Sequence, residues 1–421
     1  MKSNYKKIGA FVRQVSSRNT DLSVTNLKGI NINKEFMPSV ANINGTDLSK
    51  YKVVNKGQFA FNPMHVGRDE MLPISLWLED EPIIVSPAYI VFEIIDQSIL
   101  DPKYLMMWCS RSEFDRNCWF TTDSSVRGGF SWEDFCDIEI PIYSPSYQNK
   151  IIKEYNHIVS LIECNQQTNL KIEELILSIY KEWFVEFNFP IDKDYANLLG
   201  DLSLEGKNFK YSNCQLTYSE ELDKEIPLFW NVKTIGDYAK VKSGFAFKSE
   251  SWKDDGIPVI KIGSIKNKFV SYTDLGFVEN TFLKKAKSYT AKYGDLVIAM
   301  TGATIGKIGV VPKSKTEFLV NQRVGIFDLN GNLRHLPFLY CVLLQKNVEE
   351  EILNVGGDSA QANISSVQIE GIKLVLPSDK VLEKFNNKTY KLFEIMLNKY
   401  YEQYILNNLL NITLQRMSIS K

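Results

Sequence analysis

The feature that most constrains this chain is a heptad pattern that occurs twice. In residues 151–183, seam-forming side chains recur at alternating steps of four and three, which is the spacing of a coiled-coil seam. Adding 234 to each position gives a second seam with the same polar interruption at its middle. The two seams consist of Ile151, Tyr155, Ile158, Ile162, Asn165, Asn169, Ile172, Ile176, Ile179 and Trp183, and of Phe385, Thr389, Leu392, Met396, Lys399, Gln403, Leu406, Leu410, Thr413 and Met417. Two helices in one register are predicted to pack against each other, although each could instead pack on its own domain.

The polar interruption, which we call the polar layer, consists of Asn165, Asn169, Lys399 and Gln403. In an antiparallel pair, residue i faces residue 568 minus i, so the four polar side chains meet one another and apolar layers meet at both ends. A parallel pair also superposes these layers. We favour the antiparallel pair because residues 190–228 have to return the chain, and we expect the polar layer to fix the register of the helices.

The regions that precede the two helices also resemble each other. Lys7–Gly9, Gly57–Phe61 and Val91–Glu93 match Thr234–Gly236, Gly294–Ile298 and Ile326–Asp328, at offsets of 227, 237 and 235. Short apolar runs bounded by Gly, Pro, Asn or Asp predict short strands and turns in both regions. We therefore predict an α+β fold with two strand-rich mixed α/β domains, separated by two long helices that form an antiparallel coiled coil. The expected parts are residues 1–145 and 229–378 for the domains, 146–189 and 379–421 for the helices, and 190–228 for a linker.

The net charge of −1 conceals two basic regions. Residues 1–78 carry eleven Lys and Arg against five Asp and Glu, and residues 233–323 carry sixteen against eight. A local positive field attracts phosphate whatever the distant charges are. Two anion-binding surfaces are therefore expected, the alternative being two faces of solvated lysines.

No motif in the sequence predicts catalysis. The segment Gly302–Ile308 has three residues between its glycines where a phosphate loop has four, and Ile308 replaces the magnesium-binding hydroxyl. Asn62–His65 lacks the second proline and the aromatic of the amino-methyltransferase motif, and no GxGxxG or GxSxG segment is present. We expect a binding protein that holds no metal or cofactor.

Six cysteines lack zinc-ligand spacing and are expected to be reduced core thiols. No run approaches 18 uninterrupted apolar residues, and the first residues lack the apolar core of a signal peptide. We therefore expect a cytoplasmic protein with no membrane partner.

Side chains that suit DNA are plentiful in and near the basic regions. Guanidinium and amide groups can form bidentate contacts with guanine and adenine, and lysines neutralise phosphates. Phe245 and its aromatic neighbours are expected to support these loops, or else to form a core beneath a lysine face. The DNA-binding candidates are Arg13, Asn62, Arg68, Arg127, Phe245, Lys248, Lys261, Lys266, Gln322, Arg323, Gln361 and Asn363.

Several stretches together resemble one known family. They are Ile226–Trp230, Lys233–Asp237, Ser243–Phe247, Gly294–Leu296, Thr301–Gly306 and Asn321–Arg323, with GQFAFNP, SPAYIVF and SVRGGFSWEDF as a more divergent counterpart in the first half. In this order, with two long helices, the chain resembles the specificity subunit of type I restriction-modification systems. One of these stretches adds Thr301, Thr304 and the neighbouring Lys307 to the DNA-binding candidates.

The resemblance implies two target recognition domains, each reading one half of a bipartite site in double-stranded DNA. It implies a non-catalytic subunit that docks two modification (methyltransferase) subunits and, through them, restriction subunits. S-adenosylmethionine, ATP and Mg are then expected on the partner subunits only. Two other readings are a stand-alone DNA methyltransferase with fused recognition domains, which the missing cofactor motifs disfavour, and a coiled-coil scaffold that binds no DNA.

Overall fold

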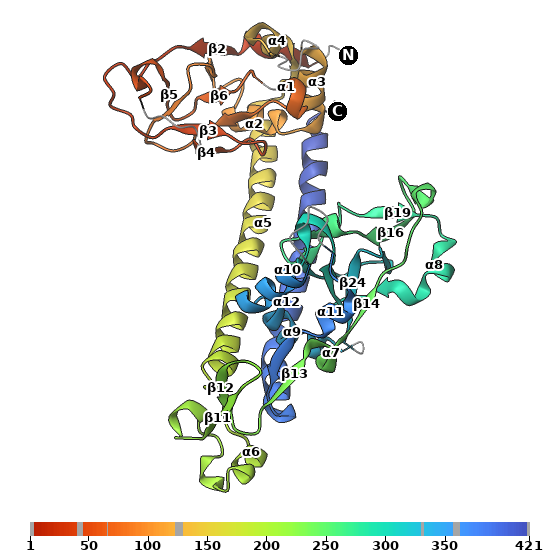
Figure 1. The fold of residues 1–421 in the computed structure, drawn as a ribbon. Helices are drawn as coiled ribbons and strands as arrows, with labels where there is room; N and C mark the ends of the chain where they lie inside the picture. The colour runs from red at the N-terminus through yellow and green to blue at the C-terminus, as the bar shows by residue number, and fades with distance from the viewer. Residues whose placement is uncertain are drawn as a thin grey trace. The chain divides into compact units, whose positions relative to one another are not determined.

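The computed structural model describes residues 4–39, 45–64, 66–122, 129–329, 332–356 and 363–418 (Figure 1). The chain divides into two compact units, which we call unit 1 (Met1–Ile162 and Leu406–Lys421) and unit 2 (Glu163–Ile405). Each unit contains part of both long helices. No helix in the described part of the chain combines the length and the apolar character that a membrane span needs.

The two predicted long helices are present as α5 (Pro145–Tyr180) and α12 (Asp379–Arg416). The chain continues from α5 into a π-helical turn, η3 (Lys181–Val185), and all ten positions of each seam are buried or partly buried. In unit 1, Arg416 donates to Glu154 at 2.8 Å. In unit 2, Asn169 donates to the Met396 carbonyl at 3.4 Å, and the ring of Trp183 lies 6.0 Å from that of Phe385. These pairs agree with the predicted antiparallel register to within three positions, so the antiparallel pairing is confirmed within each unit.

Unit 1 has a four-stranded antiparallel sheet in the order β2-β9-β6-β7 and three smaller strand pairs, β1-β10, β3-β4 and β5-β8. Phenylalanine rings pack together in its core: the rings of Phe59 and Phe92 are stacked 4.8 Å apart, and the ring of Phe135 lies tilted 4.9 Å from that of Phe92. The strands are β1 (Tyr5–Lys7), β2 (Val12–Val15), β3 (Lys28–Ile30), β4 (Phe36–Pro38), β5 (Lys52–Val54), β6 (Phe59–Phe61), β7 (Ile74–Leu76), β8 (Ile83–Val85), β9 (Ile90–Ile94) and β10 (Glu139–Pro141). The short helices are α1 (Val66–Asp69), α2 (Pro102–Cys109), α3 (Ser112–Thr121) and α4 (Trp132–Asp137).

Unit 2 has two larger sheets, a six-stranded one in the order β14-β24-β21-β22-β18-β17 and a five-stranded one in the order β15-β19-β16-β23-β20. Their strands are β14 (Lys240–Ser243), β15 (Trp252–Lys253), β16 (Ile257–Ile260), β17 (Ile265–Lys266), β18 (Phe269–Val270), β19 (Gly276–Val278), β20 (Thr290–Ala291), β21 (Leu296–Ala299), β22 (Ile308–Val310), β23 (Phe318–Val320) and β24 (Val324–Asp328). Beside them lie the pairs β11 (Leu216–Ser219) with β12 (Lys224–Pro227), and β13 (Asn231–Thr234) with β25 (Lys373–Leu376). The short helices are α6 (Lys193–Leu198), α7 (Ile235–Tyr238), α8 (Phe282–Lys285), α9 (Leu336–Leu343), α10 (Lys346–Gly356) and α11 (Ser366–Glu370).

The internal repeat extends to strand register. Phe59 pairs with Phe92 between β6 and β9, and Leu296 pairs with Phe327 between β21 and β24, at the offsets that the sequence predicts. Strands β1 and β13 each pair with the strand that precedes a long helix. Each of these strands is followed by a glycine in a tight contact. A Cβ atom added to Gly9 would lie 2.7 Å from the Cβ of Cys136, and one added to Gly236 would lie 2.8 Å from the Cβ of Glu370. The two repeats therefore share a close contact at which only glycine fits without a shift of the neighbouring residue. The predicted strand-rich α+β architecture is confirmed.

The segment expected as a linker, residues 190–228, has structure of its own. It contains α6, β11 and β12, and its Phe209 ring stacks on Phe189 at 4.9 Å. Phe189 in turn lies 4.7 Å from Trp230, at the start of the strand-rich part of unit 2. Through this aromatic packing, residues 190–228 form part of the hydrophobic core of unit 2.

All six cysteines are free thiols. Five are buried or partly buried, as the core reading predicts. Cys164 is the exception, because it lies on the exposed face of α5.

Candidate nucleic-acid interface

The site begins at a tight turn, Asn321–Arg323, which joins β23 of one sheet to β24 of the other. The amide of Val324 donates to the Asn321 carbonyl at 2.9 Å, and Asn321 Oδ1 accepts from the Arg323 amide at 3.2 Å. Backbone bonds thereby fix the turn, which leaves the side chains of Gln322 and Arg323 exposed. A guanidinium and an amide presented side by side are the groups that read base edges.

A second segment, Ser243–Phe247, lies directly against this turn. The Gln322 amide donates to the Phe245 carbonyl at 2.9 Å, and the Phe245 amide donates to the Val320 carbonyl at 2.7 Å. Gly244 is required at this contact, because a Cβ atom there would lie 2.3 Å from the Val320 carbonyl oxygen. The fold thus joins two stretches that are far apart in the sequence.

The turn forms one wall of a pocket of about 380 Å³ in unit 2. Lys261 also lines this pocket, with its ammonium 5.5 Å from the centre of the Trp252 ring. The lining of the pocket therefore combines an ammonium, a guanidinium, side-chain amides and aromatic rings. Its lining residues are Phe247, Trp252, Lys261, Ile262, Asn321, Gln322 and Arg323.

A second loop extends this surface. The Met300 amide donates to the Arg323 carbonyl at 2.9 Å, and the Ile364 amide donates to the Met300 carbonyl at 3.0 Å. The neighbouring residues Thr301 and Asn363 face each other in an antiparallel bridge. Thr301 Oγ1 is buried without a hydrogen-bond partner among the described residues. Backbone hydrogen bonds therefore connect three separate segments that carry polar candidates.

Thr304 and Lys307 lie in the connection that follows Thr301. It links the antiparallel strands β21 and β22 as a hairpin, whereas a phosphate loop leads from a strand into a helix. The Thr304 hydroxyl donates to the Thr301 carbonyl at 3.4 Å, and Lys307 is exposed.

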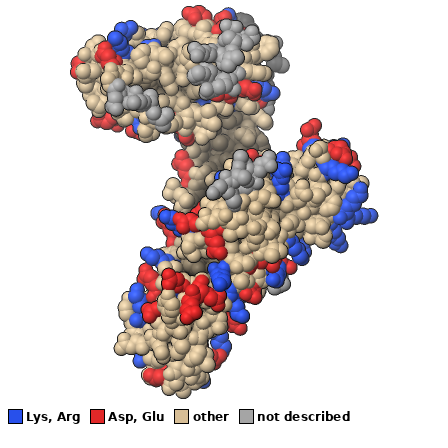
Figure 2. Space-filling view, in the orientation of Figure 1, with Lys and Arg blue, Asp and Glu red and all other residues tan. Residues whose placement is uncertain are grey.

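The candidate lysines differ in their partners. Lys248 is exposed, whereas Lys266 forms an ion pair with Asp274 at 2.5 Å. Hydrogen bonds from Lys266, and then from Ser271, lower the pKa of the Asp274 carboxyl to about 2. Figure 2 shows Lys and Arg side chains gathered over α8 and β19 of unit 2. A basic face attracts anions. Lys266 lies on another strand, β17, and already has an acidic partner.

Phe245 is partly buried within an aromatic cluster. Its ring lies 5.0 Å from Phe247 and 5.5 Å from Tyr289. Of the two readings of this aromatic segment, the core reading is the one that fits. We expect Phe245 to contact DNA only through the turn that it supports.

Of the first-half candidates, the structure describes the side chains of Arg13 and Asn62. Arg13 on β2 forms an ion pair with Glu93 at 2.6 Å, and hydrogen bonds from Gln58 and Arg13 lower the pKa of Glu93. Asn62 accepts from the Met64 amide at 3.0 Å, at the end of β6. Arg127 and Gln361, the latter in the second half, lie outside the described residues, as does the side chain of Arg68.

The polar layer is only partly paired across the helices. Asn165 is buried and its Nδ2 has no partner in the described part of the chain, while Asn169 donates to a backbone carbonyl of α12. Lys399 pairs with Glu402 of its own helix at 2.9 Å, and Gln403 is partly buried. The predicted role of these residues in setting the register remains a prediction.

Comparison with known proteins gives consistent matches. The profile of a family described as the type I restriction modification DNA specificity domain matches residues 227–407. The type I restriction enzyme MjaIX specificity subunit of Methanocaldococcus jannaschii is 27% identical over 67% of this chain, a match that spans 60% of that relative's length. The HindI specificity subunit of Haemophilus influenzae is 21% identical over 97% of both chains. The crystal structure of the type I S subunit from M. genitalium matches with a TM-score of 0.56 at 16% identity, covering 100% of this chain and 97% of that one, and thus has the same fold.

Proposed function

This chain belongs to the family of type I restriction-modification specificity subunits, and we propose that it recognises a bipartite DNA target, with one half read by each strand-rich region. In this proposal the protein has no catalytic role. It docks two modification subunits that supply S-adenosylmethionine and methylate adenine, and through them the restriction subunits that use ATP and Mg. The function of the chain is then to select the sequence at which its partners act.

The observation that carries this proposal is the set of exposed polar side chains on connected segments of unit 2. Gln322 and Arg323 project from one turn, and Asn363 lies on an adjacent loop that is hydrogen-bonded to it through Met300. Amide and guanidinium groups discriminate bases in the major groove, and Lys261 beside them provides a phosphate contact. The internal repeat supports a second, equivalent reading surface in the first half. Different side chains there predict a different half-site.

The test is methylation mapping of the complex. The chain is co-expressed with its modification subunits, and the modified adenines in the host DNA are located by sequencing. Arg323→Ala is expected to relax one base position in one half-site, at a cost of about 1–3 kcal/mol, and to leave the other half unchanged. Lys346→Ala is the matched control, because Lys346 is an exposed cation of the same unit that pairs with Glu350.

Two results would oppose the proposal. If Arg323→Ala leaves both the methylated motif and its affinity unchanged, this turn does not read bases. If the chain is not retained on duplex DNA in a salt-dependent manner, it is a scaffold rather than a DNA-binding subunit, because phosphate contacts weaken as counterions accumulate.

A further inference from the structure

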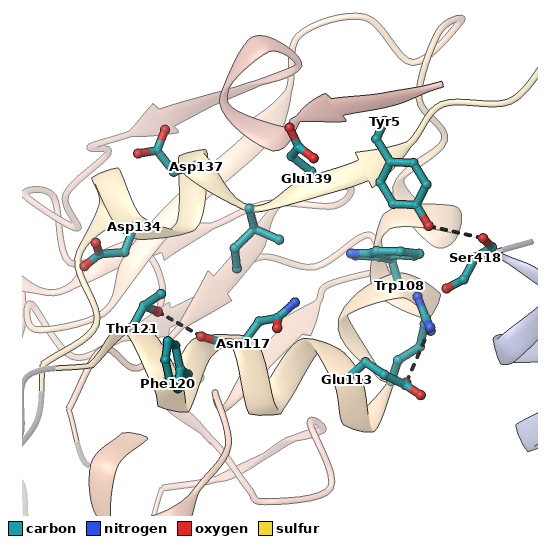
Figure 3. A pocket seen from close by; sticks show the side chains of 12 residues that line it. Tyr5, Trp108, Glu113, Asn117, Phe120, Thr121, Asp134, Asp137, Glu139 and Ser418 are labelled. Carbon is teal, nitrogen blue, oxygen red and sulfur yellow. Dashed lines mark hydrogen bonds and ion pairs between the residues drawn. The ribbon is translucent and has the colours of Figure 1, made fainter. Parts of the chain in front are cut away.

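A second pocket, in unit 1, has a different chemical character from the DNA-reading surface. It has a volume of about 620 Å³ and lies among α2, α3, α4 and β10. Its lining has four carboxylates, Glu113, Asp134, Asp137 and Glu139, against the single guanidinium of Arg111. In Figure 3 the carboxylates of Asp134, Asp137 and Glu139 lie along one side and that of Glu113 on the opposite side. Such a rim repels phosphate, so a nucleic acid is a poor occupant.

Two hydrogen-bond donors of this pocket have no acceptor. Trp108 and Arg111 are each only 6% exposed. The Arg111 guanidinium pairs with Glu113 at 3.4 Å through one terminal nitrogen, but neither Trp108 Nε1 nor Arg111 Nε has a partner among the described residues. The guanidinium of Arg111 lies 4.2 Å from the Trp108 ring centre, so the two donors belong to one stacked pair. Figure 3 shows the Trp108 indole nitrogen directed away from Ser418 and toward Asn117, into the group of lining residues. Buried donors of this kind are normally satisfied, so the missing acceptor points to a ligand.

An apolar side chain completes the pocket. Phe120, at the end of α3, is 86% exposed although it is one of the largest apolar residues. An exposed aromatic next to a hollow is typical of a surface that another molecule covers. The ligand therefore needs three features at once: neutral acceptors for the donors, apolar groups for Phe120, and positive charge for the rim.

We propose that this pocket binds a basic, partly apolar peptide segment of a partner protein. Backbone carbonyls of an extended segment are neutral acceptors for Trp108 and Arg111, a Leu or similar side chain covers Phe120, and a Lys or Arg side chain meets the carboxylates. Glu139 is the best counterion, because it forms no ion pair within 4 Å in the described part of the chain, whereas Lys7, which also feels the charge of Glu139, is paired with Asp137 at 2.8 Å. This site goes beyond DNA recognition and would exist whichever bases the protein reads.

The probe is a blocked tetrapeptide, acetyl-Leu-Arg-Leu-Gly-amide, and the control probe is the same peptide with Glu in place of Arg. The full chain is labelled with 15N-tryptophan, which gives indole N–H signals from seven tryptophans, and Trp108→Phe assigns one of them. The basic peptide should move the Trp108 indole proton downfield, as a new hydrogen bond does, with a dissociation constant of about 1 mM or tighter. Trp230, whose indole N–H in unit 2 is also buried and unpartnered, should not move.

Calorimetric titration of the peptides gives a second measurement of binding, and its variants change exposed carboxylates and no buried residue. Glu139→Gln should weaken binding of the basic peptide by about twofold to fivefold and leave the acidic peptide unaffected. Glu133→Gln, an exposed carboxylate of α4 outside the pocket, should change neither.

Four outcomes would overturn the proposal. The first is an unmoved Trp108 signal with no binding heat from the basic peptide. The second is equal binding of the acidic peptide. A Trp108 shift caused by duplex DNA would mean that the site belongs to nucleic-acid recognition. A shift of the free protein's Trp108 signal after deletion of residues 419–421 would identify the end of this chain, not a partner, as the occupant.

Discussion

Glu173 of α5 joins the long helix to the strand-rich part of unit 2, and its removal gives the sharpest stability prediction. The carboxylate accepts from Lys268 Nζ at 2.7 and 2.8 Å and from the Tyr340 hydroxyl of α9. Burial, followed by the charge of Glu173, raises the pKa of Tyr340 well above its ordinary value, so that the hydroxyl stays a donor. Glu173→Ala removes the acceptor from both partners.

The two partners should respond very differently. Tyr340 is 1% exposed, so its orphaned hydroxyl cannot reach water and costs about 1–3 kcal/mol. The Lys268 side chain is 40% exposed and regains solvent, so that ion pair contributes only about 0–1 kcal/mol. Glu173→Ala should therefore destabilise unit 2 by about 1–4 kcal/mol, with most of the loss coupled to Tyr340.

Native-state hydrogen exchange of α9 measures this loss locally, which avoids assuming that the two units unfold together. A double-mutant cycle with Tyr340→Phe should give a coupling of about 1.5–3 kcal/mol, the range for a hydrogen bond to a charged group. Tyr211→Phe, at an exposed tyrosine of the same unit, is the control and should cost nothing measurable. The reasoning is refuted if Glu173→Ala and Tyr340→Phe are additive within about 0.5 kcal/mol.

Replacing the four residues of the polar layer with Leu should raise the melting temperature in calorimetry and broaden the spread of gap lengths in methylation mapping, because polar seam residues cost stability and confer register; a destabilised variant with an unchanged gap would argue against that role. Because Lys266 holds the folded-state pKa of Asp274 at about 2, against an ordinary 3.8, its stabilisation is complete above pH 4 and is lost as the pH falls through 2. As the pH falls from 4 to 2, the urea midpoint of Asp274→Asn should therefore fall less steeply than that of the parent protein. If the two plots of midpoint against pH are parallel, Asp274 does not stabilise the fold in this way. Lys307→Ala should lower the salt slope of duplex binding in anisotropy titrations by about 0.9 without changing the motif, whereas Lys346→Ala should leave the slope unaltered.

The helices and their pairing could be predicted from sequence because a heptad seam is a local pattern that is read one position at a time. Full or partial burial of every seam position and the contact of Trp183 with Phe385 follow from that pattern. The internal repeat could likewise be extended to strand register, since Phe59–Phe92 and Leu296–Phe327 pair at the predicted offsets.

The order of the strands could not be predicted. The strands of unit 2 have two to five residues, and pairings such as β18 with β22 join segments about forty positions apart. For the same reason the sequence could not decide whether Phe245 faced DNA or a core. The packing of residues 190–228 was missed, although the density of aromatics from Phe184 to Trp230 could have indicated a core there. Side chains such as Glu173, Trp108 and Phe120 belong to no recognisable sequence motif. Their partners, or their lack of partners among the described residues, become apparent only in the folded structure.

We propose that the two long helices set the spacing of the split DNA target, and lengthening both helices tests this proposal directly. Seven residues are inserted into α5 between Ile158 and Ile162, and seven into α12 between Leu406 and Leu410, the facing positions of the antiparallel seam. Inserting one heptad lengthens each helix by about 10 Å, or about three base pairs of DNA. A second variant, with three heptads inserted in each helix, lengthens them by about 32 Å, which is close to one turn of the duplex. Methylation of a DNA library with all gap lengths then reports the preferred spacing. We predict that both half-sites persist with a gap that lengthens in step with the insertion; an unchanged gap, or a continuous target in the parent protein, would contradict the claim.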